Sequence, residues 1–192
     1  MRLFVAIEIP EAIRQQLGLG SRELRRVLPR ARWVRPELMH LTLLFLGETD
    51  GELVPGLDRR LGEAFGSYRP LAIRVSDLGA FPPKGRKRVI WAGIDADGDL
   101  TGLQAAVEKA VEEVTGQEVV KKKGKPYHPH LTLARCDPPW PASALERLAA
   151  GFGHDHSRPF RVAEGFLIES ELRRGAGPRY RKVSAYPLKG AP

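Results

Sequence analysis

The spacing of hydrophobic and polar positions predicts strands and helices along the whole chain. Runs of β-branched and aromatic residues, or apolar residues alternating with polar ones, predict strands, and apolar residues three or four positions apart predict helices. We expect strands at 2–9, 40–46, 71–81, 88–94, 128–135, 159–168 and 179–187. We expect helices at 11–28, 52–65 and 142–150, and another between Asp99, which would cap it, and Gly116, which would end it.

The two halves of the chain resemble each other. The tetrapeptide HLTL occurs at 40–43 and again at 130–133, FVAI at Phe4 matches WAGI at Trp91, and RVSDLGAF at Arg74 matches RVAEGFLI at Arg161, all at nearly the same separation. Matches in the same order at one separation indicate an internal duplication. We therefore expect a single α+β domain over 1–192. It would have two pseudo-symmetric lobes, each with an antiparallel sheet and outer helices, and a central cleft carrying both HLTL strands.

Composition narrows the class of partner. The chain has 31 basic and 23 acidic side chains and a formal charge of +8. This charge favours a polyanionic partner such as nucleic acid, although charge that only keeps the protein in solution is an open alternative.

The sole cysteine, Cys136, excludes an intramolecular disulfide and is expected to be a small buried residue. With no apolar stretch of membrane-spanning length, we expect a cytoplasmic protein without a membrane partner.

The repeated HLTL strands carry the candidate chemistry. Because side chains alternate along a strand, His40 and Thr42 would share one face while the neighbouring leucines anchor the other, and the same holds for His130 and Thr132. Two imidazoles across a cleft can remove a proton on one side and deliver one on the other. The threonine hydroxyls and the guanidinium of Arg135 could hold a phosphate between them.

Metal and cofactor chemistry is not predicted. Neither HLTL frame is followed by a third ligand, and the chain contains no HExxH, CxxC or GxxxxGK[ST] motif. His154 and His156 in "HDH" are expected to lie on a loop surface. His128 is expected to point away from the cleft, because Pro129 interrupts regular strand pairing beside it.

Longer stretches around these motifs resemble one enzyme family. The segments "RLFVAIEIP", "WVRPELMHLTLLFLGE", "LGAFPPKGRKRVIWAG", "PHLTLARC" and "LIESEL" are similar to those of the RNA 2',3'-cyclic phosphodiesterases, also called the 2'-5' RNA ligase (LigT) family, within the 2H phosphoesterase superfamily. The resemblance runs from residue 2 to about 172. It implies a bilobal fold and hydrolysis of RNA 2',3'-cyclic phosphate ends to 2'-phosphomonoesters, without metal or ATP.

The resemblance also implies a role for each site residue. His40 would be the proton donor, His130 the proton acceptor, and Thr42 and Thr132 would hold the phosphate together with Arg135. Phe45 would stack on the terminal base, with core packing as the open alternative. From their charge alone, Lys84 and Arg86 in the turn-rich segment PPKGRK are expected to contact phosphates. KKKGK at 121–125 is expected to follow the RNA backbone, with a solvated charge run between elements as the open alternative.

Several alternatives remain open at this level. With a 5'-hydroxyl RNA in place of water, the same residues would form a 2'-5' bond, so the family resemblance also implies reversible ligation. The substrate could include tRNA fragments, and we expect a monomer. A non-catalytic RNA-binding module, or a 2H enzyme acting on a small cyclic phosphate such as ADP-ribose 1",2"-cyclic phosphate, would share many of these features.

Overall fold

The computed structural model describes residues 1–116, 126–140, 158–173 and 177–190. The predicted helix at 142–150, the KKKGK segment and the HDH histidines lie outside the described residues. The described elements are β1 (Arg2–Glu8), α1 (Glu11–Val27), β2 (Arg32–Trp33), η1 (Pro36–Leu38), β3 (His40–Glu48), η2 (Gly51–Leu53), α2 (Val54–Gly66), β4 (Leu71–Phe81), β5 (Lys87–Asp97), α3 (Leu100–Thr115), β6 (His130–Trp140), β7 (Phe160–Val162), β8 (Glu164–Arg173) and β9 (Gly177–Pro187).

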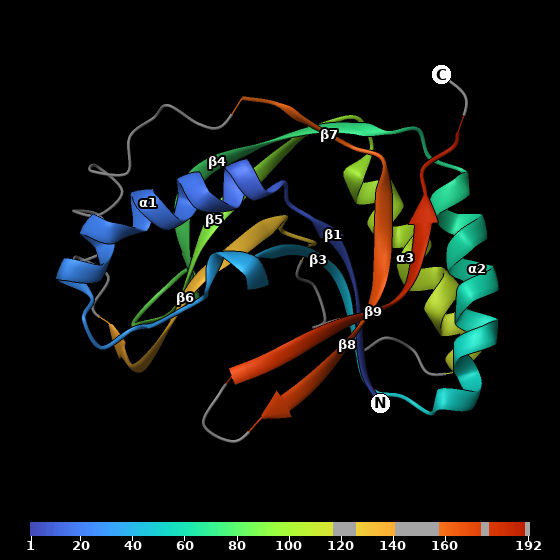
Figure 1. Ribbon diagram of the computed structural model, residues 1–192, viewed down its shortest axis with the longest axis horizontal. Coiled ribbons are helices and arrows are strands. Elements are labelled where there is room, and N and C mark those ends of the chain that lie inside the picture. Colours follow the sequence, from blue (N-terminus) through green and yellow to red (C-terminus); the bar gives the residue numbers. More distant parts are fainter. Residues whose placement is uncertain (117–125, 141–157, 174–176, 191–192) are drawn as a thin grey trace.

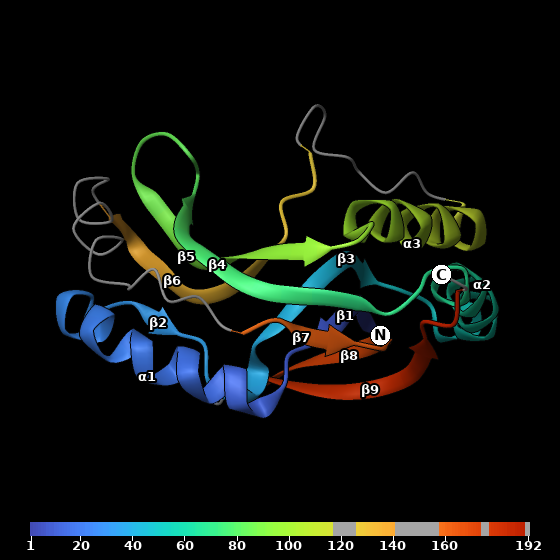
Figure 2. The same ribbon diagram turned by 90° about the horizontal axis from the view of Figure 1, so that it is seen from above.

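The strands form one curled antiparallel sheet (Figures 1 and 2), which confirms the α+β class. Its order is β7-β4-β5-β6-β3-β1-β8-β9, with β2 paired to β6. Outward from the central β6–β3 pair, β5 corresponds to β1, β4 to β8 and β7 to β9. The two sheets expected from the sequence are thus joined into one, and the described part of the β3–β6 ladder contains a single residue pair, Leu41 with Leu131.

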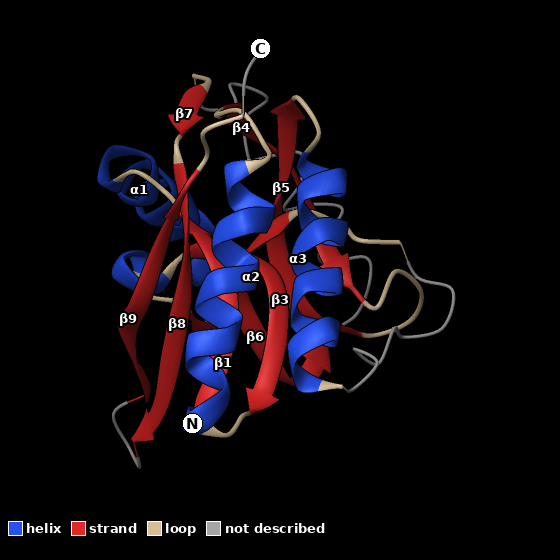
Figure 3. Cartoon of the chain, turned by 90° about the vertical axis from the view of Figure 1, so that its right-hand side faces the viewer, coloured by secondary structure: helices blue, strands red, loops and turns tan. Residues whose placement is uncertain are grey.

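All three described helices pack against the leucine face of the sheet. Leu17 of α1, Leu61 of α2 and Leu103 of α3 join the main core with Leu41 and Leu131, and all five are at most 6% exposed. Figure 3 shows α2 and α3 side by side across this face, while α1 lies toward the other end of the molecule. These described helices leave the histidine face uncovered. None of them is long and apolar enough to cross a membrane.

Most predicted elements are confirmed, with boundary shifts of a few residues. Asp99 caps α3 by accepting from the Gly102 N–H, and Gly116 ends it with a φ of 64°, a left-handed conformation that glycine tolerates best. The single strand expected at 159–168 is wrong: it is two strands, β7 and β8, separated at Ala163. The sixth strand begins at His130 and continues to Trp140, beyond the predicted end at 135.

Candidate active site

The two HLTL strands lie side by side at the centre of the sheet. Because Leu41 pairs with Leu131 in antiparallel register, His40 lies alongside Thr132 and Thr42 alongside His130. The histidines therefore occupy a diagonal, for which ideal strand geometry gives a separation of about 7–8 Å. As predicted from alternation, Leu41 and Leu131 are fully buried and the histidines are partly exposed.

A bulge in β3 brings Phe45 onto the histidine face. Thr42 pairs with Ala6 and Leu44 with Val5, so one extra residue, Leu43, is accommodated between the two pairs. An extra residue reverses the alternation beyond it. Leu43 and Leu44 are consequently both buried, and Phe45 is 66% exposed. The alternative that Phe45 packs in the core is wrong.

An equivalent bulge in β6 brings Arg135 onto the same face. Thr132 pairs with Trp91 and Ala134 with Ile90, which leaves Leu133 as the extra residue. Leu133 and Ala134 are both buried and Arg135 is exposed. Phe45 and Arg135 therefore occupy matching positions in the two strands, each five residues after its histidine.

Both histidines are oriented by the same backbone contact. His40 Nδ1 lies 2.9 Å from the carbonyl oxygen of Leu38, and His130 Nδ1 lies 2.7 Å from that of His128. A carbonyl oxygen only accepts hydrogen bonds, so Nδ1 carries the proton in both rings. In each neutral ring Nε2 is then the basic nitrogen, available to take up or give back a proton.

The electrostatic surroundings of the two imidazoles differ. Burial lowers the pKa of His40, and the charge of His130 lowers it further. The hydrogen bond to the Leu38 carbonyl and the negative charge of Glu8 act in the opposite direction and raise it. Burial also lowers the pKa of His130; the His128 carbonyl opposes it, and the His128 imidazole and Arg135 lower the pKa further. His40 thus has a carboxylate in its neighbourhood, whereas His130 has the Arg135 guanidinium and a second imidazole.

Aromatic rings surround both histidines. The His40 ring centroid lies 4.8 Å from that of Phe4 and 5.3 Å from that of Tyr180. The His130 ring lies 5.1 Å from Phe81 and 6.0 Å from Trp91. No motif in the sequence pointed to Tyr180, whereas Phe4, Phe81 and Trp91 all lie in segments that match between the two halves of the chain.

The expectation that His128 points away from the cleft is wrong. Its ring lies 6.3 Å from that of His130, nearly parallel to it, and 4.5 Å from that of Trp91. Pro129 is not part of β6, but the extended segment before the strand still keeps positions 128 and 130 on one side. Simple alternation would have placed His128 correctly.

A tyrosine hydroxyl links the two halves of the site. The Tyr127 hydroxyl donates to the Thr42 carbonyl oxygen at 3.0 Å, from just before β6 across to β3. Burial raises the pKa of Tyr127, so its hydroxyl stays protonated and remains a donor. The sequence offered little indication of this contact beyond the position of Tyr127 three residues before His130.

The predicted basic contacts lie on the turn between β4 and β5. Lys84 and Arg86 are exposed there. Arg86 donates to the Pro139 carbonyl oxygen at 2.7 and 3.1 Å, which holds the turn over the end of β6. Lys87 is 7% exposed and its ammonium donates to the carbonyl oxygens of Pro82 and Pro83, so this third cation has a structural role.

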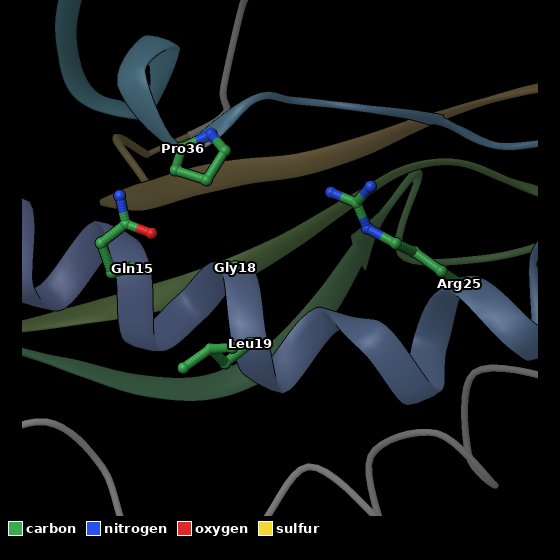
Figure 4. A pocket seen from close by; sticks show the side chains of 5 residues that line it. All are labelled: Gln15, Gly18, Leu19, Arg25 and Pro36. Atoms are coloured by element: carbon green, nitrogen blue, oxygen red, sulfur yellow. The ribbon is translucent and has the colours of Figure 1, made fainter.

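A hollow in the surface stands apart from the histidines. It has a volume of about 250 Å³ and lies between α1 and η1. It is lined by Gln15, Gly18, Leu19, Arg25 and Pro36 (Figure 4). None of these residues belongs to an HLTL strand.

Within the described residues, no three His, Cys, Asp or Glu side chains gather as a group that could hold a metal ion. Cys136 is buried as expected, and burial raises the pKa of its thiol.

Comparison with known proteins gives consistent matches over the whole chain. The model of the 2'-5' RNA ligase superfamily matches residues 9–173. The chain is 36% identical to the RNA 2',3'-cyclic phosphodiesterase of Thermus thermophilus, over 99% of this chain and 91% of the relative. It is 31% identical to the protein of the same name from Archaeoglobus fulgidus, over 97% and 99%.

Two solved structures have a similar fold over nearly the whole chain. A crystal structure of a Thermus thermophilus protein superposes with a TM-score of 0.79 at 33% identity, covering 99% of each chain. E. coli LigT in apo form gives a TM-score of 0.71 at 25% identity, covering 97% of this chain and 96% of that one. The described architecture is therefore that of LigT-like structures.

Proposed function

The chain belongs to the 2'-5' RNA ligase superfamily, and we propose that it hydrolyses RNA 2',3'-cyclic phosphate ends to 2'-phosphomonoesters. Relatives named RNA 2',3'-cyclic phosphodiesterase support cyclic phosphodiesterase activity as the coarser conclusion. The observation that carries the finer proposal is the matched pair of histidines. Each has Nδ1 held by a carbonyl oxygen, and both lie on one open face of two adjoining strands.

In the proposed reaction, His130 Nε2 takes a proton from water while the water oxygen forms a bond to phosphorus. The bond from phosphorus to the 3' oxygen breaks, and His40 Nε2–H gives its proton to that oxygen. The 2' oxygen keeps its bond to phosphorus, so the product is a 2'-phosphomonoester. Positioned general acid and base catalysis contributes about 10²–10⁴-fold in such reactions.

The charges around the two rings support this assignment of roles. Glu8, the strand partner of His40, favours the protonated imidazolium that an acid needs. Arg135 and His128 favour the neutral imidazole of His130 that a base needs. Sequence symmetry alone makes the two histidines equivalent, whereas their neighbours do not.

The remaining site residues would hold the phosphate and the base. Thr42 and Thr132 lie beside the opposite histidine and would donate to the non-bridging oxygens. Arg135 would add a charged, planar donor, which suits phosphate geometry. Phe45, exposed on the same face, would stack on the terminal base.

The same groups would run the reaction with a 5'-hydroxyl RNA in place of water, forming a 2'-5' bond and releasing the 3'-hydroxyl. Ligation needs no ATP in this scheme, because the cyclic phosphate supplies the bond energy. We also propose RNA ends, including those of tRNA fragments, as the physiological substrate, and a monomer in the cytoplasm.

Product identity tests the proposal. Purified protein with adenosine 2',3'-cyclic phosphate in the presence of EDTA is expected to yield 2'-AMP alone, as resolved from 3'-AMP by chromatography. A 3'-AMP product would contradict the assignment of the 3' oxygen as the leaving group. No turnover combined with tight, salt-sensitive RNA binding would instead favour a non-catalytic RNA-binding module. Strong preference for a small cyclic phosphate over RNA ends would favour the small-substrate alternative.

A further inference from the structure

Three aromatic side chains lie on the flank of His130 opposite His40. β6 lies between β3, which carries His40, and β5, which carries Trp91, and β4 with Phe81 follows beyond β5. His128 joins them from the segment before β6, with its ring 4.5 Å from Trp91 and 5.7 Å from Phe81. Three separate chain segments thus form one group of rings, which we call the flanking cluster.

The flanking cluster is open, whereas its counterpart beside His40 is closed. His128 is exposed, and Phe81 and Trp91 are partly exposed. On the His40 side, Phe4 is 3% exposed and is covered by Tyr180 and Phe45. Phe4 therefore fills a core, while the flanking cluster presents ring surface to solvent beside the proposed base.

The backbone beneath the flanking cluster leaves room for the large indole. A Cβ at Gly79 would overlap the Trp91 ring, so only glycine at that position lets the indole lie flat over β4. Such a flat aromatic surface is suited to stacking on a nucleobase, because every base has an aromatic face.

Positive charge lies at the edge of the flanking cluster. The turn that follows Phe81 carries exposed Lys84 and Arg86. Arg86 is held over the end of β6 by the Pro139 carbonyl. Cations beside a stacking surface are the usual arrangement for binding a nucleotide strand.

We propose that Phe81, Trp91 and His128 form a second nucleoside subsite, which binds the nucleoside whose 5' oxygen is joined to phosphorus by a 2'-5' bond. This inference rests on the proposed function, because it assigns the group that replaces water beside His130. The incoming or leaving 5' oxygen must meet His130 Nε2, so its nucleoside extends past His130 toward β5 and β4. The phosphates on its 3' side then reach Lys84 and Arg86.

The subsite is used only when the second nucleoside is present. In cleavage of adenylyl(2'→5')adenosine, the 3'-hydroxyl gives its proton to His40 and its oxygen bonds to phosphorus. The bond from phosphorus to the 5' oxygen breaks, and His130 gives that oxygen a proton. The products are adenosine 2',3'-cyclic phosphate and adenosine. Hydrolysis of adenosine 2',3'-cyclic phosphate itself places only water beside His130.

The test is the ratio of kcat/KM for adenylyl(2'→5')adenosine to kcat/KM for adenosine 2',3'-cyclic phosphate. His128→Ala is expected to lower this ratio by about 5- to 100-fold, the range that one stacked base contributes. His128→Phe keeps a flat ring and is expected to keep the ratio within about threefold of wild type. Trp91→Ala, checked for folding by circular dichroism, is expected to lower it as His128→Ala does.

Phe45→Ala is the matched control, since it removes an aromatic ring from the other strand. It is expected to lower kcat/KM for both substrates in proportion and leave the ratio unchanged. An unchanged ratio in both His128→Ala and Trp91→Ala would overturn the subsite, and so would wild-type protein that hydrolyses the cyclic phosphate but not the dinucleotide. If the ratio falls in His128→Phe as far as in His128→Ala, the stacking role of this position would be overturned. Failure of the wild type on adenosine 2',3'-cyclic phosphate would instead remove the proposed function.

Discussion

The hydroxyl of Tyr127 provides a sharp test of how the two histidines are held in register. In the described part of the β3–β6 ladder only Leu41 and Leu131 pair, and the Tyr127 hydroxyl adds a second link by donating to the Thr42 carbonyl at 3.0 Å. Tyr127→Phe removes this link and leaves a carbonyl without its partner. We expect lower stability and, because the separation of the histidines becomes less well defined, a lower kcat.

The magnitudes follow from the contact that is lost. An acceptor left unsatisfied in a partly buried place costs about 1–3 kcal/mol, and each kcal/mol lowers Tm by about 2–4 °C in a chain of this size. A misplacement of about 1 Å can cost about 10²-fold in rate. Because the Leu41–Leu131 pair remains, we expect a smaller loss of kcat, about 10-fold, with KM changed little.

Tyr186→Phe is the matched control. The Tyr186 hydroxyl donates to Asp58 Oδ1 at 2.5 Å, so this substitution also removes one partly buried hydroxyl contact, but between β9 and α2. We expect a comparable loss of Tm with no change in kcat. Thermal unfolding and steady-state kinetics with adenosine 2',3'-cyclic phosphate measure both effects. Equal kcat in the two variants, with both folded, would refute the proposed role of Tyr127.

Two further predictions concern the bulge positions. Arg135→Ala is expected to raise the pKa of His130, because the Arg135 charge lowers it. Since the base must be neutral, the acid limb of the pH profile of kcat/KM should move to higher pH. An acid limb that does not move would contradict the electrostatic role of Arg135. Phe45→Ala is expected to raise KM for the cyclic nucleotide by about 5- to 100-fold, while urea unfolding stays close to wild type because the side chain is 66% exposed. A large loss of stability in this variant would indicate a packing role instead.

The positions of the strands and the identity of the reacting groups could be predicted from the sequence. Alternation in HLTL separates the buried leucines from the histidines and threonines, and three of the four predicted helices lie within the described residues and are confirmed. The internal duplication stays a prediction, which the mirrored strand order about β3 and β6 supports. These features depend on local periodicity, which a single sequence records directly.

The faces of Phe45 and Arg135 could not be derived from alternation. A regular strand would place position 45 opposite position 40, but the bulge at Leu43 reverses this. Its local signal is faint, namely consecutive apolar residues after the threonine in TLLF and TLAR. Whether such a pair forms a bulge depends on the neighbouring strand.

Contacts between segments distant in the sequence could not be predicted either. Tyr180 approaches His40 from β9, and Tyr127 reaches across to β3, although neither belongs to a motif. Such contacts depend on tertiary packing and on how far the sheet curls. The same holds for the charges of Glu8 and Arg135, which distinguish two histidines that look equivalent in the sequence.

We propose that His40 and His130 together carry out metal-independent acid and base catalysis on a cyclic phosphate. The most direct measurement is the initial rate of adenosine 2',3'-cyclic phosphate hydrolysis in EDTA by wild type, His40→Ala and His130→Ala. We expect full wild-type activity in EDTA and a loss of about 100-fold or more in each variant. Activity within about tenfold of wild type in either variant, or a wild type inactivated by EDTA, would contradict it.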